Sequence, residues 1–75
     1  MDFDDDYDAT GLLCPLPVLR ARKRLQALQP GQVLRLTATD PAAIVDVPHF
    51  CAQTGHRLLA MHDADTAQVY FIKKS

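Results

Sequence analysis

Cys14 is the residue of this chain whose type and setting best suit covalent chemistry. It lies in the run Leu13-Cys14-Pro15-Leu16-Pro17. The thiolate of cysteine is a nucleophile, but an ordinary thiol is mostly protonated at neutral pH. The start of a helix would favour the thiolate, whereas apolar neighbours would disfavour it. We therefore expect a modest lowering of the Cys14 pKa and an exposed, weakly activated thiol.

The two prolines indicate how this thiol is held. Proline is favoured at the first helical position, and the residue before a proline adopts angles that suit an N-cap. These rules predict Cys14 as the N-cap and Pro15 as the first helical residue, with Pro15 and Pro17 fixing the backbone around the sulfur. The residues alone also allow an inert, packed thiol beside a helix that begins with proline.

The other potential metal ligands and thiols have simpler interpretations. Cys51 lies on an apolar helical stripe, which predicts a core residue, although pairing with Cys14 would be possible if their Cα atoms were within about 7 Å. His49, His56 and His62 lack the spacing of zinc ligands with either cysteine. We expect no metal and no other cofactor.

Polar and basic residues near Cys14 leave two interpretations each. Asp8 could bond the amides of the loop before Cys14, or could be a plain turn residue, and Gly11 marks the turn itself. Asp40 fits a helix cap better than a catalyst. Arg22 and Lys23 could dock an acidic partner or a phosphate backbone, or could belong to a solvated helix face.

Composition limits the protein class. The chain has 75 residues, of which 48% are hydrophobic and 23% charged, with a net charge of −1. These values predict one small globular domain, and they disfavour both disorder and strongly electrostatic binding of nucleic acid. The acidic start does not resemble a secretory signal, and no apolar run is long enough to span a membrane. With two cysteines, the expected compartment is the reducing cytoplasm.

Hydrophobic periodicity and turn residues predict the order β-α-β-α-β-β. The first helix carries a stripe of Val18, Ala21, Leu25 and Leu28, and the second a stripe of Ile44, Val47, Cys51 and Thr54, with Pro48 expected to kink or split it. The predicted elements are strand 7–10, helix 15–29, strand 33–39, helix 41–54 ended by Gly55, and strands 57–61 and 69–72 joined by a turn at 63–66.

These elements predict an α+β fold, a two-layer α/β sandwich in which both helices cover one face of a four-stranded mixed sheet. Residues 1–6 are expected to be disordered or loosely ordered, and residues 7–75 to form the single domain.

Several short motifs closely resemble the TusA/SirA (YedF-like) family of small sulfur-transfer proteins. They are Asp8-x-x-Gly11-x-x-Cys14-Pro15-x-Pro17, Arg22-Lys23, Pro30-Gly31, Asp40-Pro41-Ala42, Asp46-Val47-Pro48 and Phe50-Cys51. The resemblance implies the same sandwich, a sulfurtransferase role in a sulfur relay, and Cys14 as the carrier of sulfur in a persulfide. It also implies positioning roles for Asp8, Gly11, Pro15 and Pro17, and a docking role for Arg22 and Lys23.

The resemblance further implies a cysteine desulfurase or rhodanese-like sulfur donor and a downstream acceptor protein. The relay would lead to tRNA thiolation, cofactor biosynthesis or sulfur oxidation. Many members of the tRNA pathway have an acidic residue between the prolines, and Leu16 stands there in this chain. We expect a monomer that contacts neither membrane nor nucleic acid directly. The alternatives are a non-catalytic RNA- or protein-binding regulatory module that uses the basic helix face, and a thiol redox protein, which the lack of a C-x-x-C motif disfavours.

Overall fold

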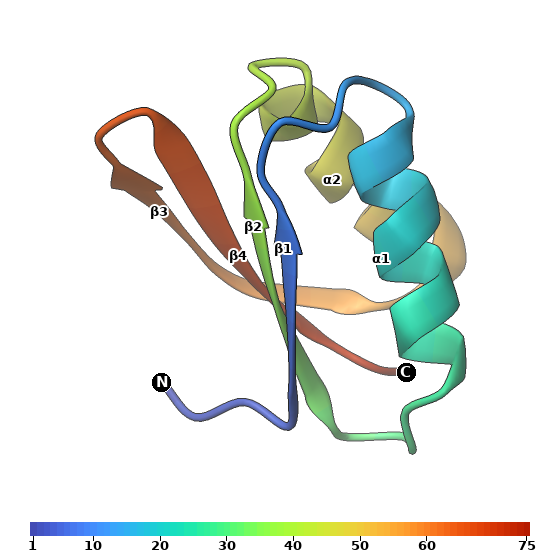
Figure 1. Cartoon of the computed structure of the whole chain (residues 1–75). Helices are drawn as coiled ribbons and strands as arrows, with labels where there is room; N and C mark the ends of the chain where they lie inside the picture. Colours follow the sequence, from blue (N-terminus) through green and yellow to red (C-terminus); the bar gives the residue numbers. More distant parts are fainter.

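Strands and helices alternate along the computed structural model, which describes all 75 residues, in the predicted order β-α-β-α-β-β (Figure 1). The elements are β1 (Asp5–Ala9), α1 (Leu16–Gln26), β2 (Val33–Ala38), α2 (Ala43–Thr54), β3 (Arg57–Ala64) and β4 (Ala67–Lys73). Neither helix has the length and apolar character needed to cross a membrane.

The strands form one mixed sheet in the order β1-β2-β4-β3. β1 and β2 run parallel, and β4 runs antiparallel to both of its neighbours. A parallel pair needs a crossover connection, which α1 supplies. Both helices lie on the same face of the sheet, as Figure 1 shows, so the predicted two-layer sandwich is confirmed.

The core lies between the helices and the central strands. Side chains alternate along β2, where Leu34, Leu36 and Ala38 are buried and the residues between them are half-buried. Leu34 and Leu36 face Ile72 and Tyr70 of β4 across the sheet, and these are fully buried too. This period of two places one apolar face under the helices.

The helices pack through stripes that match the prediction only in part. In α1, Ala21 and Leu25 are fully buried, and Val18 and Leu28 pack against the core, as predicted. The stripe predicted for α2 is wrong at both of its ends.

In α2 the buried residues are Ala43, Val47, Phe50 and Cys51, whereas Ile44 is 42% exposed. Thr54, at the other end of the predicted stripe, is exposed too. The predicted split of the helix is also wrong, because α2 runs through Pro48 without interruption. Gly55 ends the helix in a left-handed conformation, with φ at 81°, as predicted.

The ends of several strands differ from the prediction. β1 begins at Asp5, so the expected loose order of residues 1–6 is wrong for Asp5 and Asp6. Their carboxylates pair at 2.8 Å with Arg24 of α1 and with Arg35 of β2, respectively. The predicted strands at 57–61 and 69–72 are longer and leave a turn of only Asp65-Thr66. An acidic strand such as β1 lacks the apolar alternation on which the sequence prediction relied.

Candidate functional site

Cys14 lies in the turn between β1 and α1, and it is exposed. Because β1 and β2 are parallel, the loops that follow them leave the same edge of the sheet, at the upper end in Figure 1. The loop after β2 leads into α2. The fold therefore places Cys14 beside the start of α2, about thirty residues away along the chain.

Two hydrogen bonds join these neighbouring loops. The Gly11 amide donates to Oγ1 of Thr39 at 2.9 Å, and Gly11 adopts a φ of 83° that favours glycine. The Cys14 amide donates to Oδ2 of Asp40, whose Oδ1 accepts from the Ala42 amide at 3.1 Å. Asp40 therefore holds the turn before α2 and the backbone of Cys14. It is not the predicted helix cap and Pro41 is not the first helical residue, because α2 begins at Ala43 with Ala42 as its N-cap and no side chain caps it.

The first helix begins one residue later than the sequence rules predict. α1 starts at Leu16 with Pro15 as its N-cap, so Cys14 is not the N-cap and Pro15 is not the first helical residue. Pro15 is exposed beside the sulfur, whereas Pro17 is buried. The thiol of Cys14 lies before the N-cap. The first amides of α1 therefore do not stabilise its thiolate as they would stabilise the side chain of an N-cap residue.

The carboxylate of Asp46 lies against the thiol of Cys14. Asp46 lies in the first turn of α2, and its Oδ2 accepts a hydrogen bond from Cys14 Sγ at 2.9 Å. This bond raises the pKa of Cys14, and the negative charges of Asp46 and Asp40 act in the same direction. The expected lowering of this pKa is wrong, because sequence reasoning had no means of placing an α2 carboxylate at the sulfur.

We predict that the alkylation of Cys14 by iodoacetamide titrates at a higher pH than the alkylation of an unstructured cysteine peptide, because the pKa of Cys14 is raised. The thiolate is the reacting form, so a raised pKa moves the rise in rate to higher pH. The rate is measured against pH by mass spectrometry, with the alkylated peptide identified. Asp46→Asn should move the midpoint to lower pH, and a wild-type midpoint below that of the unstructured peptide would contradict the geometry.

A cleft of about 410 Å³ opens beside the sulfur between α1 and α2. It is lined by Cys14, Pro15, Val18, Leu19, Arg22, Asp46, His49, Phe50, Gln53 and Thr54. Arg22 forms no ion pair, because the ion pairs of the chain involve Arg24 and Arg35. A guanidinium free to bind an anion therefore lines the same cleft as the thiol.

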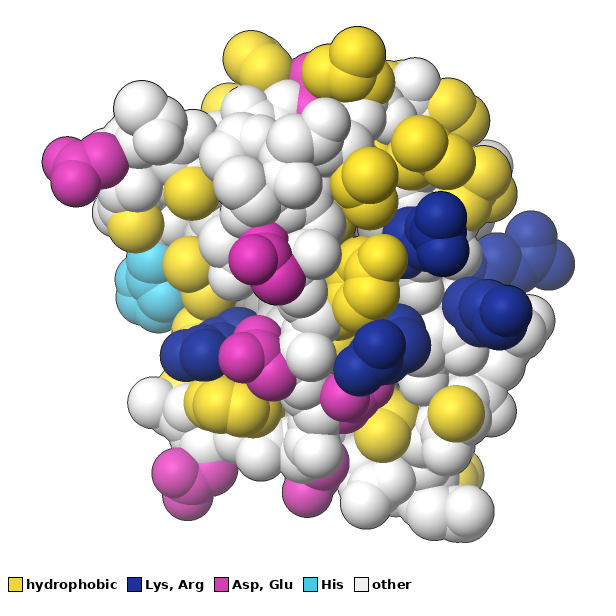
Figure 2. All heavy atoms as spheres, in the orientation of Figure 1, with side chains coloured by type: hydrophobic (Ala, Val, Ile, Leu, Met, Phe, Trp, Pro, Cys, Tyr) yellow, Lys and Arg dark blue, Asp and Glu magenta, His cyan; other side chains and the backbone are white.

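Exposed apolar side chains at the starts of the two helices form what we call the apolar rim. It consists of large hydrophobic side chains that are 39–69% exposed at the starts of the two helices: Leu13, Leu16, Leu19, Ile44 and Val45. Figure 2 shows hydrophobic side chains gathered over the upper end of α1, with lysine and arginine side chains further down that helix. Exposed apolar surface with basic residues beside it is typical of a protein-binding site.

The remaining predicted site residues lie further away. Oδ1 of Asp8 accepts from the amide of Thr10 at 2.9 Å, so Asp8 forms a local turn at the end of β1. Lys23 lines a separate hollow of α1 together with Arg20 and Arg24, and does not share the cleft with Arg22.

The second cysteine and the histidines do not gather at the thiol. Cys51 is buried in the core, as predicted, and burial raises its pKa to about 11. His49 lines the cleft, His56 contacts Phe50 and the C-terminal Ser75, and His62 packs on the sheet. No group of three potential metal ligands is found.

Sequence reasoning missed Asp46 as a site residue. Asp46 appears there only within the Asp46-Val47-Pro48 motif, with no role assigned. A usable signal existed, because predicted parallel pairing of the first two strands would place the loops after them side by side. A carboxylate in the first turn of the second helix would then be a candidate neighbour of Cys14.

Comparisons with known proteins find one family of relatives that matches nearly the whole chain. The family described as "Sulfurtransferase TusA" matches residues 6–74. The "Sulfur carrier protein TusA" of Allochromatium vinosum is 47% identical over 74 residues, covering 99% of this chain and 97% of the relative. That of Pseudomonas entomophila is 42% identical over 71 residues, covering 95% and 89%. The crystal structure of a SirA-like protein from Desulfitobacterium hafniense has the same fold, with a TM-score of 0.84 at 24% identity, covering 93% of this chain and 96% of that one.

Proposed function

The chain belongs to the TusA family of sulfurtransferases, and we propose that it carries sulfur as a persulfide on Cys14. The observation that supports this role most directly is the exposed thiol at the mouth of a cleft, beside an apolar rim that a partner could cover. The other cysteine is buried in the core. The alternative of a non-catalytic RNA- or protein-binding module finds no support in the comparisons.

Loading is an exchange between sulfur atoms. The Cys14 sulfur attacks the outer sulfur of a donor persulfide, a new S–S bond forms at Cys14, and the S–S bond of the donor breaks. The electron pair of that bond leaves on the donor sulfur, which takes up the proton that Cys14 loses. No net oxidation or reduction occurs, so the step needs no cofactor.

Delivery repeats this exchange in the other direction. An acceptor thiolate attacks the outer sulfur of the loaded carrier, and Cys14 leaves with the electron pair. Exposure of Cys14 allows both partners to approach in turn. Burial of Pro17 anchors the turn in the core, and the bond from the Cys14 amide to Asp40 holds the turn from the other side, so that the sulfur keeps its direction during both exchanges.

A sulfur carrier requires a donor and an acceptor. We propose a cysteine desulfurase or a rhodanese-like protein as the donor and a protein thiol as the acceptor. The apolar rim would be covered in each complex, and Arg22 would pair with an acidic group at its edge.

Incubation with a cysteine desulfurase and cysteine tests the proposed function. The intact protein should gain the mass of one sulfur atom, and the added sulfur should be lost on treatment with dithiothreitol. If no added sulfur appears with a cysteine desulfurase or with a rhodanese-like donor, the proposed function is wrong.

We predict that Arg22→Glu weakens loading by a protein donor. Arg22 is an unpaired cation at the cleft, so reversal of its charge should raise the half-saturating donor concentration by about threefold to tenfold at low salt. The effect should shrink as salt is added. Initial loading rates are measured against donor concentration.

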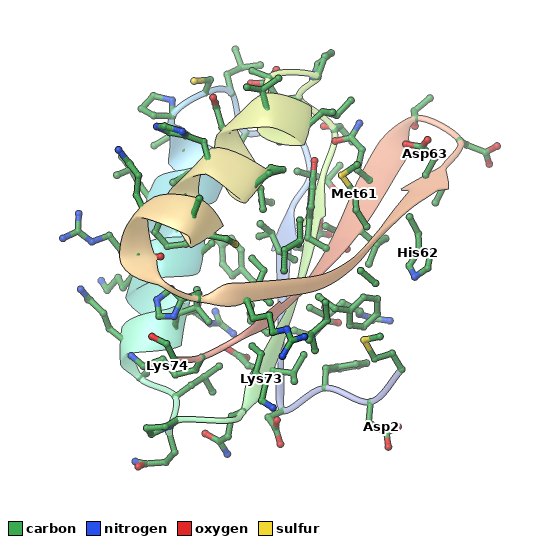
Figure 3. All side chains as sticks on the ribbon, turned by 180° about the vertical axis from the view of Figure 1, so that it is seen from behind. Asp2, Met61, His62, Asp63, Lys73 and Lys74 are labelled. Carbon is green, nitrogen blue, oxygen red and sulfur yellow. The ribbon has the colours of Figure 1, made fainter.

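Lys73→Glu is the matched control for Arg22→Glu. Lys73 pairs with Val33, the first residue of β2, and so lies at the end of the sheet away from Cys14. Figure 3 shows it beside Lys74, at the opposite end of the molecule from Asp63. If both variants raise the half-saturating donor concentration equally, the effect comes from net charge and not from docking at the cleft.

A further inference from the structure

The Asp46 carboxylate contacts the Cys14 sulfur. Oδ2 of Asp46 accepts a hydrogen bond from Cys14 Sγ at 2.9 Å, and Asp46 takes part in neither ion pair of the chain. Asp40, the other nearby carboxylate, uses both of its oxygens to accept backbone amides. The two carboxylates therefore differ in role: Asp40 holds the backbone, and Asp46 contacts the reacting atom.

We propose that Asp46 sets how tightly this carrier retains its sulfur: it accepts a hydrogen bond from the empty Cys14 thiol and repels the persulfide anion of the loaded carrier. This inference rests on the proposed function, since it assigns a role to Asp46 in sulfur exchange at Cys14. Its consequence is that the loaded state is disfavoured relative to the empty one, so sulfur passes on to the acceptor.

In the empty carrier, Cys14 and Asp46 interact favourably through a hydrogen bond. A thiol proton lies between Sγ and a carboxylate oxygen, in a hydrogen bond to a charged acceptor. The raised pKa of Cys14 has the same cause, because removal of the proton would leave two negative charges in contact. Asp46 therefore stabilises the thiol and disfavours the thiolate.

The loaded carrier loses that arrangement. A persulfide gives up its proton more readily than the parent thiol, so its outer sulfur carries negative charge at neutral pH. This charge lies one S–S bond, about 2 Å, beyond a sulfur that Asp46 contacts. The hydrogen bond of the empty state is gone and repulsion replaces it.

Delivery then returns the pair to its favourable state. The acceptor thiol passes its proton to the Cys14 persulfide anion, and the acceptor thiolate then attacks the outer sulfur of the neutral persulfide. A new S–S bond forms on the acceptor and the S–S bond at Cys14 breaks. Its electron pair stays on Sγ, which takes up the proton of the transferred sulfur and donates it again in a hydrogen bond to Asp46. The acceptor leaves as a persulfide anion, so charge, protons and oxidation state balance.

Other ionisable groups line the same cleft and affect how strongly the persulfide anion is disfavoured. Arg22 of α1 and His49 of α2 line the cleft with Cys14, and a positive charge there would favour the persulfide anion. Asp40 adds negative charge from the loop before α2. In the empty carrier Asp46 and Asp40 both raise the pKa of Cys14.

The test is the equilibrium of sulfur exchange between the carrier and glutathione. Purified protein is mixed with defined ratios of glutathione persulfide and glutathione at fixed pH, and the loaded fraction is read by intact mass. Asp46→Asn keeps the size of the side chain and removes its charge. We expect its equilibrium to shift toward the loaded carrier by about threefold to tenfold. Asp46→Glu, which keeps the charge, should lie closer to wild type than Asp46→Asn does.

Asp63→Asn is the matched control. Asp63 lies on the hairpin of β3 and β4, which Figure 3 shows pointing away from the two helices. This variant loses the same charge and should keep the wild-type equilibrium. An unchanged equilibrium in Asp46→Asn, or the same shift in Asp63→Asn, would overturn the inference. Failure of every variant to take up sulfur, wild type included, would instead overturn the proposed function on which the inference rests.

Discussion

Cys14→Ser is expected to abolish sulfur loading, with no mass gain after incubation with a cysteine desulfurase and cysteine. Serine keeps the size and the hydrogen-bonding capacity of the side chain near Asp46. It cannot form a persulfide, because the new S–S bond requires a sulfur atom on the carrier. Intact-mass spectrometry measures the loaded fraction directly.

Cys51→Ala is the control for the loss of a thiol. Cys51 is 3% exposed in the core between α2 and the sheet, so a donor cannot reach it without unfolding. This variant should load like wild type while losing about 1 kcal/mol of stability. Full loading of Cys14→Ser would contradict the assignment of Cys14, and loss of loading in a folded Cys51→Ala would implicate the buried thiol.

Leu25→Ala is expected to remove much of the stability of the domain. Leu25 is fully buried where α1 packs on the sheet, and its truncation leaves a cavity among Leu34, Leu36 and other core residues. Such substitutions cost about 2–5 kcal/mol. A domain of this size has a free energy of unfolding of about 4–11 kcal/mol. The variant should therefore be marginally folded and should hold the turn of Cys14 less firmly.

Urea denaturation measures this loss, and Leu19→Ala is the control on the same helix. Leu19 is 49% exposed in the apolar rim, so its truncation should change the free energy of unfolding by less than about 1 kcal/mol. Equal losses in the two variants would show that α1 does not pack as described. The two variants also separate stability from docking, because Leu19→Ala should lower donor affinity in a fully folded protein.

The order of the helices and strands and their two layers could be predicted because each depends on residues that are close together in the sequence. The alternation along β2, the stripe of Ala21 and Leu25, and the glycine at position 55 each depend on neighbouring residues. Such patterns identify a strand, a helix face and a helix end without knowledge of the rest of the fold. The predicted split of the helix at Pro48 was wrong because the propensity of one residue was weighed without the packing of Val47 and Cys51 beside it.

The chemistry of the site was less predictable because its determinants are distant in sequence. The identity of Cys14 follows from its motif, but its pKa follows from Asp46, which approaches only when the loops after β1 and β2 meet. The rule that a helix start lowers a thiol pKa was applied to a helix whose first residue is Leu16. The carboxylate of Asp46, which accepts a hydrogen bond from the sulfur, instead raises the pKa of Cys14.

The location of the carried sulfur is tested most directly by peptide mapping of the loaded wild-type protein. The protein is loaded by a cysteine desulfurase, alkylated with iodoacetamide to fix the persulfide, and digested with trypsin. Cleavage at arginine separates Cys14, which precedes Arg20, from Cys51, which lies between Arg35 and Arg57. The extra sulfur should be found on the peptide that contains Cys14 and should be absent from the peptide that contains Cys51. Extra sulfur on the Cys51 peptide alone would contradict the account.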